Sequence, residues 1–168
     1  MKRNVYLYII WQKGRHAEAR IREDLRQHYR ILKEYEVKWP WYHAIHNYAF
    51  FYRHIAFFSW LRKCWICGTG AFRMIMVEDV DSPTRRIAND QVLALKDRYR
   101  AWAGKRWRVH GASTLAETRY QYWLLAGRTL EEFLADPPSS EPETLLLTDP
   151  LTFDLEILDP NQEVKNGQ

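Results

Sequence analysis

The chain has 168 residues, enough for one domain and a tail but short for two domains. Its residues are 46% apolar and 27% charged, a balance that excludes an intrinsically disordered chain. The net charge of +4 is unevenly spread, because residues 136–168 hold eight acidic side chains and one basic one, which leaves +11 on residues 1–135. We therefore predict a basic domain over residues 1–135 and an acidic tail, partly extended or disordered, over residues 136–168.

This charge distribution favours phosphate-rich partners. A basic body attracts nucleic acid, nucleotides or anionic lipid. The alternative interpretation is a solvated surface that the acidic tail balances within the molecule. If the tail folds back onto a basic groove, it would compete with a polyanion, and its removal would strengthen polyanion binding.

The first residues and the cysteines bear on the cellular compartment. The opening MKRNVYLYIIW lacks a small-residue cleavage site, and no run reaches the roughly 18–20 apolar residues of a membrane helix. Cys64 and Cys67 form one Cys-x-x-Cys pair, which favours ordinary buried thiols over a redox pair or a metal site completed by His43 or His46. Reduced thiols without a disulfide framework predict a cytoplasmic protein with no transmembrane segment.

Three elements open the chain. Residues 5–11 form a short apolar run rich in β-branched and aromatic side chains, which is typical of a buried strand. Residues 15–29 place Ala17, Ile21 and Leu25 on one face and predict an amphipathic helix. Residues 31–37 predict a second strand. Together the three have the length of a βαβ unit, whose strands are parallel.

The later elements continue the alternation of helix and strand. The pattern predicts helices over residues 43–60 and 88–102, a loop over 63–70, strands over 72–77 and 106–110, and a helix from a Thr114–Glu117 capping box to residue 126. We therefore predict an α/β fold with a small, mostly parallel sheet of about four strands flanked by helices, followed by an extended acidic C-terminal tail. In that tail, residues 145–147 and 153–158 are apolar enough to add strands or to bind a partner.

Polar groups directly after the first strand indicate a phosphate site. Lys13, Gly14 and Arg15 stand at this position. Gly14 would let the backbone approach a ligand, and the start of the following helix would direct free amide groups at a phosphate. An exposed basic turn is the alternative.

The carboxylates after the most apolar strand indicate a metal site. Asp79 and Asp81 have the spacing with which many transferases hold a divalent cation against a diphosphate. We therefore predict Mg or Mn as a cofactor, held by Asp79 and Asp81, with Asp79 catalytic. Two carboxylates in a plain turn are the alternative.

His110 ends the short predicted strand beside Ser113 and Thr114. A histidine here can act as a catalytic acid or base next to an anion-binding helix start. A histidine hydrogen-bonded to the helix cap is the alternative.

One segment is strongly basic. Lys96, Arg98, Arg100, Lys105, Arg106 and Arg108 bring six positive charges within 13 residues, interleaved with Tyr99, Trp102 and Trp107. Such a mixture can follow the backbone of a single strand and stack its bases, so these residues form a candidate nucleic-acid interface. A solvated helix face is the alternative.

Several motifs within residues 4–128 resemble one bacterial protein family. They are Trp11-x-x-Gly14-Arg15-x-x-Glu18, Cys67-Gly68-x-Gly70-x-Phe72 with Asp79 after it, Lys96-x-x-Tyr99-Arg100-x-Trp102, His110 with Glu117, and Leu124-Leu125-x-Gly127. The chain resembles the N-terminal module of poorly characterised nucleotidyltransferase-like proteins linked to cell-surface polysaccharide synthesis. In that family a second domain follows, so the resemblance implies a partner protein that supplies it.

Two hypotheses follow, and they differ in geometry. The first is a transferase-like module that binds a nucleotide or sugar-phosphate, and it requires Lys13, Arg15, Asp79 and His110 to converge on one pocket. The second is a non-enzymatic nucleic-acid or polyanion-binding protein regulated by its tail, and it requires the basic segment to lie on one open face. An assembly subunit whose tail strands pair with another chain is a third interpretation.

Overall fold

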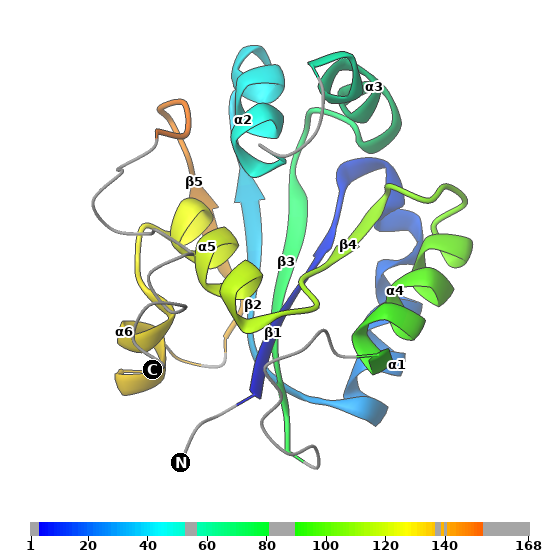
Figure 1. Ribbon diagram of the computed structural model, residues 1–168, viewed down its shortest axis with the longest axis vertical. Coiled ribbons are helices and arrows are strands. Elements are labelled where there is room, and N and C mark those ends of the chain that lie inside the picture. The colour runs from blue at the N-terminus through cyan, green and yellow to red at the C-terminus, as the bar shows by residue number, and fades with distance from the viewer. Residues whose placement is uncertain (1–3, 53–56, 81–89, 137–138, 140, 153–168) are drawn as a thin grey trace, which may run out of the picture.

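The computed structural model describes residues 4–52, 57–80, 90–136, 139 and 141–152 (Figure 1). The strands are β1 (Asn4–Ile10), β2 (Arg30–Lys38), β3 (Phe72–Asp79), β4 (Val109–Gly111) and β5 (Glu143–Leu146). The α-helices are α1 (Glu18–His28), α2 (Ala44–Phe51), α3 (Phe57–Cys67), α4 (Asp90–Trp102), α5 (Leu115–Ala126) and α6 (Leu130–Ala135), and two 3₁₀ helices are η1 (Gln12–Ala17) and η2 (Trp41–His43). No helix in these ranges is long and apolar enough to cross a bilayer.

The sheet is mostly antiparallel and has five strands in the order β4-β1-β3-β2-β5. β1 is antiparallel to β3 and β4, β2 is antiparallel to β3, and β5 is parallel to β2. The prediction of a mostly parallel sheet of about four strands was therefore wrong. β1 and β2 do run in the same direction, as the βαβ interpretation required, but β3 lies between them, which is the split βαβ arrangement of ferredoxin-like folds.

Helices cover both faces of this sheet (Figure 1). α1 and α4 pack on one face, against Tyr8, Ile10 and Val77, and α2, α5 and α6 pack on the other, against Leu7 and Ile9. Every residue of β1 is buried. A strand that is buried on both faces has an unbroken apolar sequence whatever the direction of its neighbours. For this reason the sequence of β1 is typical of a parallel strand although its neighbours are antiparallel.

Most of the aromatic content belongs to the core. Trp11 is fully buried, with its ring centre 4.6–6.3 Å from those of Trp39, Tyr48, Phe51, Tyr52 and Phe72. Its indole N–H donates a hydrogen bond of 3.3 Å to the Tyr52 hydroxyl, which satisfies the buried polar atom. In the described ranges the strongly exposed rings are those of Trp41, Tyr42 and Trp65, at 75%, 63% and 76%.

The first part of the predicted tail belongs to the fold. We call residues 139 and 141–152 the C-terminal strap. The buried ammonium of Lys33 donates hydrogen bonds to the carbonyls of Ser139 and Glu141 and pairs with the Glu143 carboxylate at 3.2 Å. β5 then pairs with the edge of β2, as the apolar residues 145–147 had suggested. Residues 153–158, the second apolar segment of the tail, lie outside the described residues.

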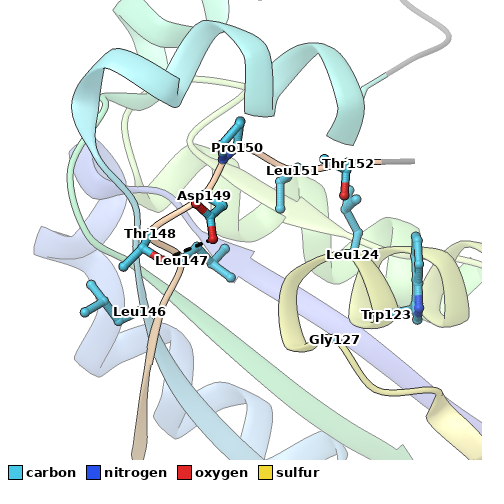
Figure 2. A pocket seen from close by; sticks show the side chains of 10 residues that line it. All are labelled: Trp123, Leu124, Gly127, Leu146, Leu147, Thr148, Asp149, Pro150, Leu151 and Thr152. Atoms are coloured by element: carbon cyan, nitrogen blue, oxygen red, sulfur yellow. Dashed lines mark hydrogen bonds between the residues drawn. The ribbon is translucent and has the colours of Figure 1, made fainter. Parts of the chain in front are cut away.

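Beyond β5, the strap passes α2 and reaches the C-terminal turn of α5 (Figure 2). Leu151 is 5% exposed and joins the core. Its N–H donates to Asn47 Oδ1 at 2.9 Å, and its carbonyl lies 2.8 Å from His46 Nε2. A hollow of about 390 Å³ remains between residues 146–152 of the strap and the α5 residues Trp123 and Leu124 with Gly127.

Candidate nucleic-acid interface around α3

Lys13 and Arg15 lie on η1 and contact different neighbours. The Arg15 guanidinium pairs with Glu18 at 2.8 Å and with Glu36 at 3.4 Å, and Arg73 pairs with the same two carboxylates. Lys13 turns the other way, because its ammonium donates a 2.7 Å hydrogen bond to the Trp65 carbonyl and lies 5.0 Å from the centre of the Trp65 ring. The two side chains therefore do not form one phosphate clamp.

Gly14 is required by a close backbone approach within the protein. The Trp11 N–H donates a 2.9 Å hydrogen bond to the Arg108 carbonyl, which draws the segment before β4 against η1. A Cβ atom on residue 14 would lie 2.8 Å from that carbonyl oxygen. Its position after the first strand predicted that this glycine admits a ligand, whereas in the fold it admits the backbone of Arg108.

Gly14→Ala is expected to lower the free energy of unfolding by about 1–3 kcal/mol, because backbone atoms must move to relieve the overlap. Urea unfolding measures the loss. His16→Ala is the control on the same 3₁₀ helix, since His16 is exposed and its truncation creates no overlap. Equal losses for the two variants would contradict this explanation.

Asp79 and His110 lie far apart. Asp79 pairs with Asn4 at the first residue of β1, whereas His110 pairs with Ile9, five residues along the same strand. At about 3.4 Å per residue this separation is roughly 17 Å along the sheet. Lys13 lies still further along, beyond the end of β1. The pocket that the first hypothesis required, with Lys13, Arg15, Asp79 and His110 together, is therefore not formed.

The metal prediction rests on a residue outside the described ranges. Asp81 is that residue, and Asp79 is 6% exposed at the end of β3. Within the described part of the chain, no group of three His, Cys, Asp or Glu side chains is placed to hold a metal ion. The Mg or Mn cofactor stays a prediction.

His110 belongs to a buried polar cluster on the side of α5. Its Nε2 lies 2.9 Å from Gln121 Oε1 and 3.4 Å from the Glu117 carboxylate, and the rings of Phe51 and Tyr52 pack edge-on against it. Burial lowers the pKa of His110, although Glu117 opposes the shift. Burial would raise the pKa of Glu117, but hydrogen bonds from His110 and the Ser113 N–H hold it below its usual value. Thr114 caps α5 by accepting from the Glu117 N–H, which is one half of the predicted capping box. The Glu117 carboxylate accepts from the N–H of Ser113 instead of that of Thr114.

The predicted basic segment does not form a single row. Arg98 pairs with Asp24 on α1, and Arg108 donates to the Ala103 carbonyl. Lys96 and Arg100 donate to the carbonyls of Gly111 and Val109, which covers the outer edge of strand β4. Lys105 and Arg106 are exposed. The expected groove of cations therefore reduces to a smaller set, because four of the six basic side chains in the segment also stabilise the fold.

In the fold, residues of α3 lie beside the cations that remain in the α4–β4 connection. The α4–β4 connection packs on α3, with the Trp107 ring 4.9 Å from the Arg62 guanidinium and 5.1 Å from the Lys63 ammonium. Arg108 donates to the Ile66 carbonyl, and Lys13 approaches Trp65 from η1. These three segments gather at one end of the sheet (Figure 1). We call the result the α3 basic surface, made of Lys13, Arg62, Trp65, Lys105, Arg106, Trp107 and Arg108.

The α3 basic surface has little negative charge to balance it. The sequence of α3, FFSWLRKCWIC, contains no acidic residue. Beside it lies a hollow of about 450 Å³ lined by Asp97, Arg100, Ala101, Gly104, Lys105 and Arg106. Sequence reasoning missed Arg62 and Trp65, because residues 63–70 were expected to be a loop. An acid-free segment with Arg and Trp three residues apart was the signal that could have found them.

Cys64 and Cys67 lie on α3 rather than in a loop. Cys67 is fully buried and donates to the Trp107 carbonyl at 3.0 Å, and both thiols are free. Burial raises the pKa of Cys64 to about 11 and that of Cys67 to about 12. Such thiols are mostly protonated at neutral pH, which favours the interpretation of ordinary buried thiols over a redox pair.

Comparisons with known proteins add little to this description. No family model matches the chain, and no curated protein matches it. Among solved structures, a nucleoside diphosphate kinase of Aquifex aeolicus aligns over 72% of this chain and 93% of its own, with a TM-score of 0.47 and 11% sequence identity. A similarity of this size does not carry a function or a binding site over to this chain.

Proposed function

We propose that this protein binds single-stranded nucleic acid through the α3 basic surface. The observation that carries the proposal is the position of five cationic side chains around two tryptophans on a surface whose central helix has no acidic residue. Cations along such a surface can neutralise successive phosphates of a nucleic-acid backbone. The second of the two sequence hypotheses is therefore the one that the geometry favours.

Trp65 is the reason for a single strand rather than a duplex. Its ring is 76% exposed, and Lys13 lies 5.0 Å from the ring centre. An exposed indole beside a cation can stack an unpaired base while the cation contacts the adjoining phosphate. Stacked base pairs of a duplex do not offer a free base face to such a ring.

The transferase hypothesis has less support. Lys13 and Arg15 lie on η1, whereas Asp79 and His110 lie at separate places on the sheet. His110 is also occupied by Gln121 and Glu117. The resemblance to nucleotidyltransferase-like modules, the sugar-phosphate ligand and the partner protein stay predictions. If a mononucleotide and an oligonucleotide bind with equal dissociation constants, the result would favour the transferase hypothesis instead.

Fluorescence anisotropy with a labelled single-stranded oligonucleotide, measured over a series of salt concentrations, tests the proposal. With four or five phosphate contacts, the logarithm of the binding constant should fall with the logarithm of salt at a slope of about −3. Trp65→Ala should weaken binding about tenfold or more with little change of slope, because stacking contributes roughly 1–3 kcal/mol per base. The double variant Lys105→Ala, Arg106→Ala should weaken binding and reduce the slope by about 1.4.

Arg26→Ala is the matched control. This arginine is half-exposed on α1 and pairs with Glu23, away from the α3 basic surface. It should leave both the affinity and the salt slope unchanged. If Arg26→Ala weakens binding as much as Lys105→Ala, Arg106→Ala does, the attraction is a general effect of net charge and the proposed interface is wrong.

A further inference from the structure

At the corner where β4 meets α3 and α4, the described residues hold positive charge that their own carboxylates balance only in part. Lys63 is 4% exposed, and its ammonium lies 3.4 Å from the centre of the Tyr52 ring and 5.1 Å from that of Trp107. Among the described residues, Lys63 contacts no carboxylate and donates no hydrogen bond. Burying a charge in this way is costly unless an anion or polar group compensates it.

Two further cations occupy the same corner. Burial lowers the pKa of Lys63 to about 8, and the charge of Arg100 lowers it further, although Cys67 opposes the shift. Burial and the same guanidinium lower the pKa of Lys96. Arg100 therefore lies close enough to Lys63 and to Lys96 to repel each of them.

The negative charge nearby is small and already engaged. The carboxylates that act on Lys96 are those of Glu117 and Asp97. Glu117 is held by His110 and the Ser113 N–H. Asp97 is 74% exposed and pairs with Arg100 at 3.0 Å, so water screens much of its charge.

Arg100 also lines the hollow of about 450 Å³, and the other cations of its lining are Lys105 and Arg106. We propose that this hollow is a binding site for a phosphate monoester, which Arg100, Lys105 and Arg106 contact directly. Lys63 and Lys96 do not line the hollow, but their charges next to Arg100 add to the attraction for an anion. A monoester carries close to two negative charges at neutral pH, against one for a phosphodiester. The site therefore favours the terminal phosphate of a strand or a free nucleoside monophosphate over an internal phosphate.

This inference goes beyond the binding of a strand and does not depend on it. Calorimetric titration with a nucleoside monophosphate, with the matching nucleoside and with inorganic phosphate tests the site itself. Anisotropy with 5′-phosphorylated and unphosphorylated forms of one oligonucleotide then distinguishes a strand end from a free nucleotide. The nucleoside monophosphate should bind at least about tenfold more tightly than the nucleoside, since a dianion meets several cations.

Three exposed positions provide the variants. Lys105→Ala and Arg106→Ala should each weaken monophosphate binding several-fold, whereas Asp97→Asn should strengthen it, because a competing carboxylate is removed. Arg26→Ala on α1 should have no effect. Equal affinity for nucleoside and nucleoside monophosphate, or monophosphate binding that none of the three variants changes, would overturn the inference.

The two proposals fail in different ways. The absolute affinity for an unphosphorylated strand and its dependence on Trp65 test the α3 basic surface. Monophosphate binding tests the hollow. The affinity ratio of phosphorylated to unphosphorylated strands shows whether the bound phosphate belongs to a strand end or to a free nucleotide. A ratio near one with tight monophosphate binding assigns the hollow to free nucleotides, and monophosphate binding without any strand binding removes only the proposed function.

Discussion

Replacing Lys63 with methionine is expected to stabilise the folded protein by about 2 kcal/mol at pH 7. The pKa of Lys63 is lowered from 10.5 to about 8 in the folded state, mainly by burial. Each unit of pKa corresponds to about 1.4 kcal/mol, so the charged form costs roughly 3 kcal/mol, of which the cation–π contact with Tyr52 returns part. Methionine fills a similar space between the rings of Tyr52 and Trp107 without a charge.

The advantage of this variant should depend on pH in one direction. A lysine whose pKa is lower in the folded state loses its proton there first, so its cost is full below pH 8 and is relieved as pH rises towards 10.5. The difference in unfolding free energy between Lys63→Met and the natural chain should therefore shrink between pH 7 and pH 9.5. The raised pKa values of Cys64 and Cys67 weaken both chains over this range, so only the difference reports on Lys63.

Urea unfolding of both chains at the two pH values measures this difference. Lys63→Gln is a useful second variant, because it removes the charge but keeps a polar group that needs a partner. It should stabilise less than methionine does. A methionine variant that is less stable at pH 7, with a difference that does not change at pH 9.5, would mean that the ammonium is compensated in solution.

The local elements could be predicted from the sequence, whereas the strand order could not. β1, β3, α1 and α4 appear close to their expected ranges, because apolar periodicity records which faces are buried. Apolar periodicity does not show which strands lie next to each other in the sheet. β1 lies between β3 and β4, and its unbroken burial arises because helices cover both faces. The helices over residues 44–51 and 57–67 were harder to predict, since their aromatic content suits strand and core equally well.

Some residues of the candidate site could be predicted from the sequence and others could not, for a similar reason. A pattern such as Lys13-Gly14-Arg15 indicates that cations and a close approach occur after a strand, but not what they approach. In the fold the partners include Trp65, the Arg108 carbonyl and Glu36, all distant in sequence. Basic composition did locate the α4–β4 connection, because Lys105 and Arg106 have no such partners in the described ranges. Arg62 and Trp65 join them only through the packing of Trp107 on α3.

The strap gives the second large expected effect. Leu151→Ala should lower the free energy of unfolding by about 2–3 kcal/mol, the lower part of the range for a buried leucine, because the strap packs on the outside of the core and can partly close the cavity. Leu151 is 5% exposed and fixed through both backbone groups by Asn47 and His46. The control is Leu146→Ala in the same segment, which is 68% exposed and should change stability by less than about 0.5 kcal/mol.

Composition alone leads to the opposite expectation for Leu151, because it lies in the part of the sequence predicted to be an acidic tail. The pairing of β5 with β2 and the Lys33 contacts place the strap at the sheet edge opposite β4, away from the α3 basic surface. Urea unfolding of the two leucine variants therefore decides between a strap that belongs to the core and a tail that is free to compete for the basic surface. Equal and negligible losses would mean that the strap detaches in solution, and the tail of the sequence hypothesis would then begin at residue 136.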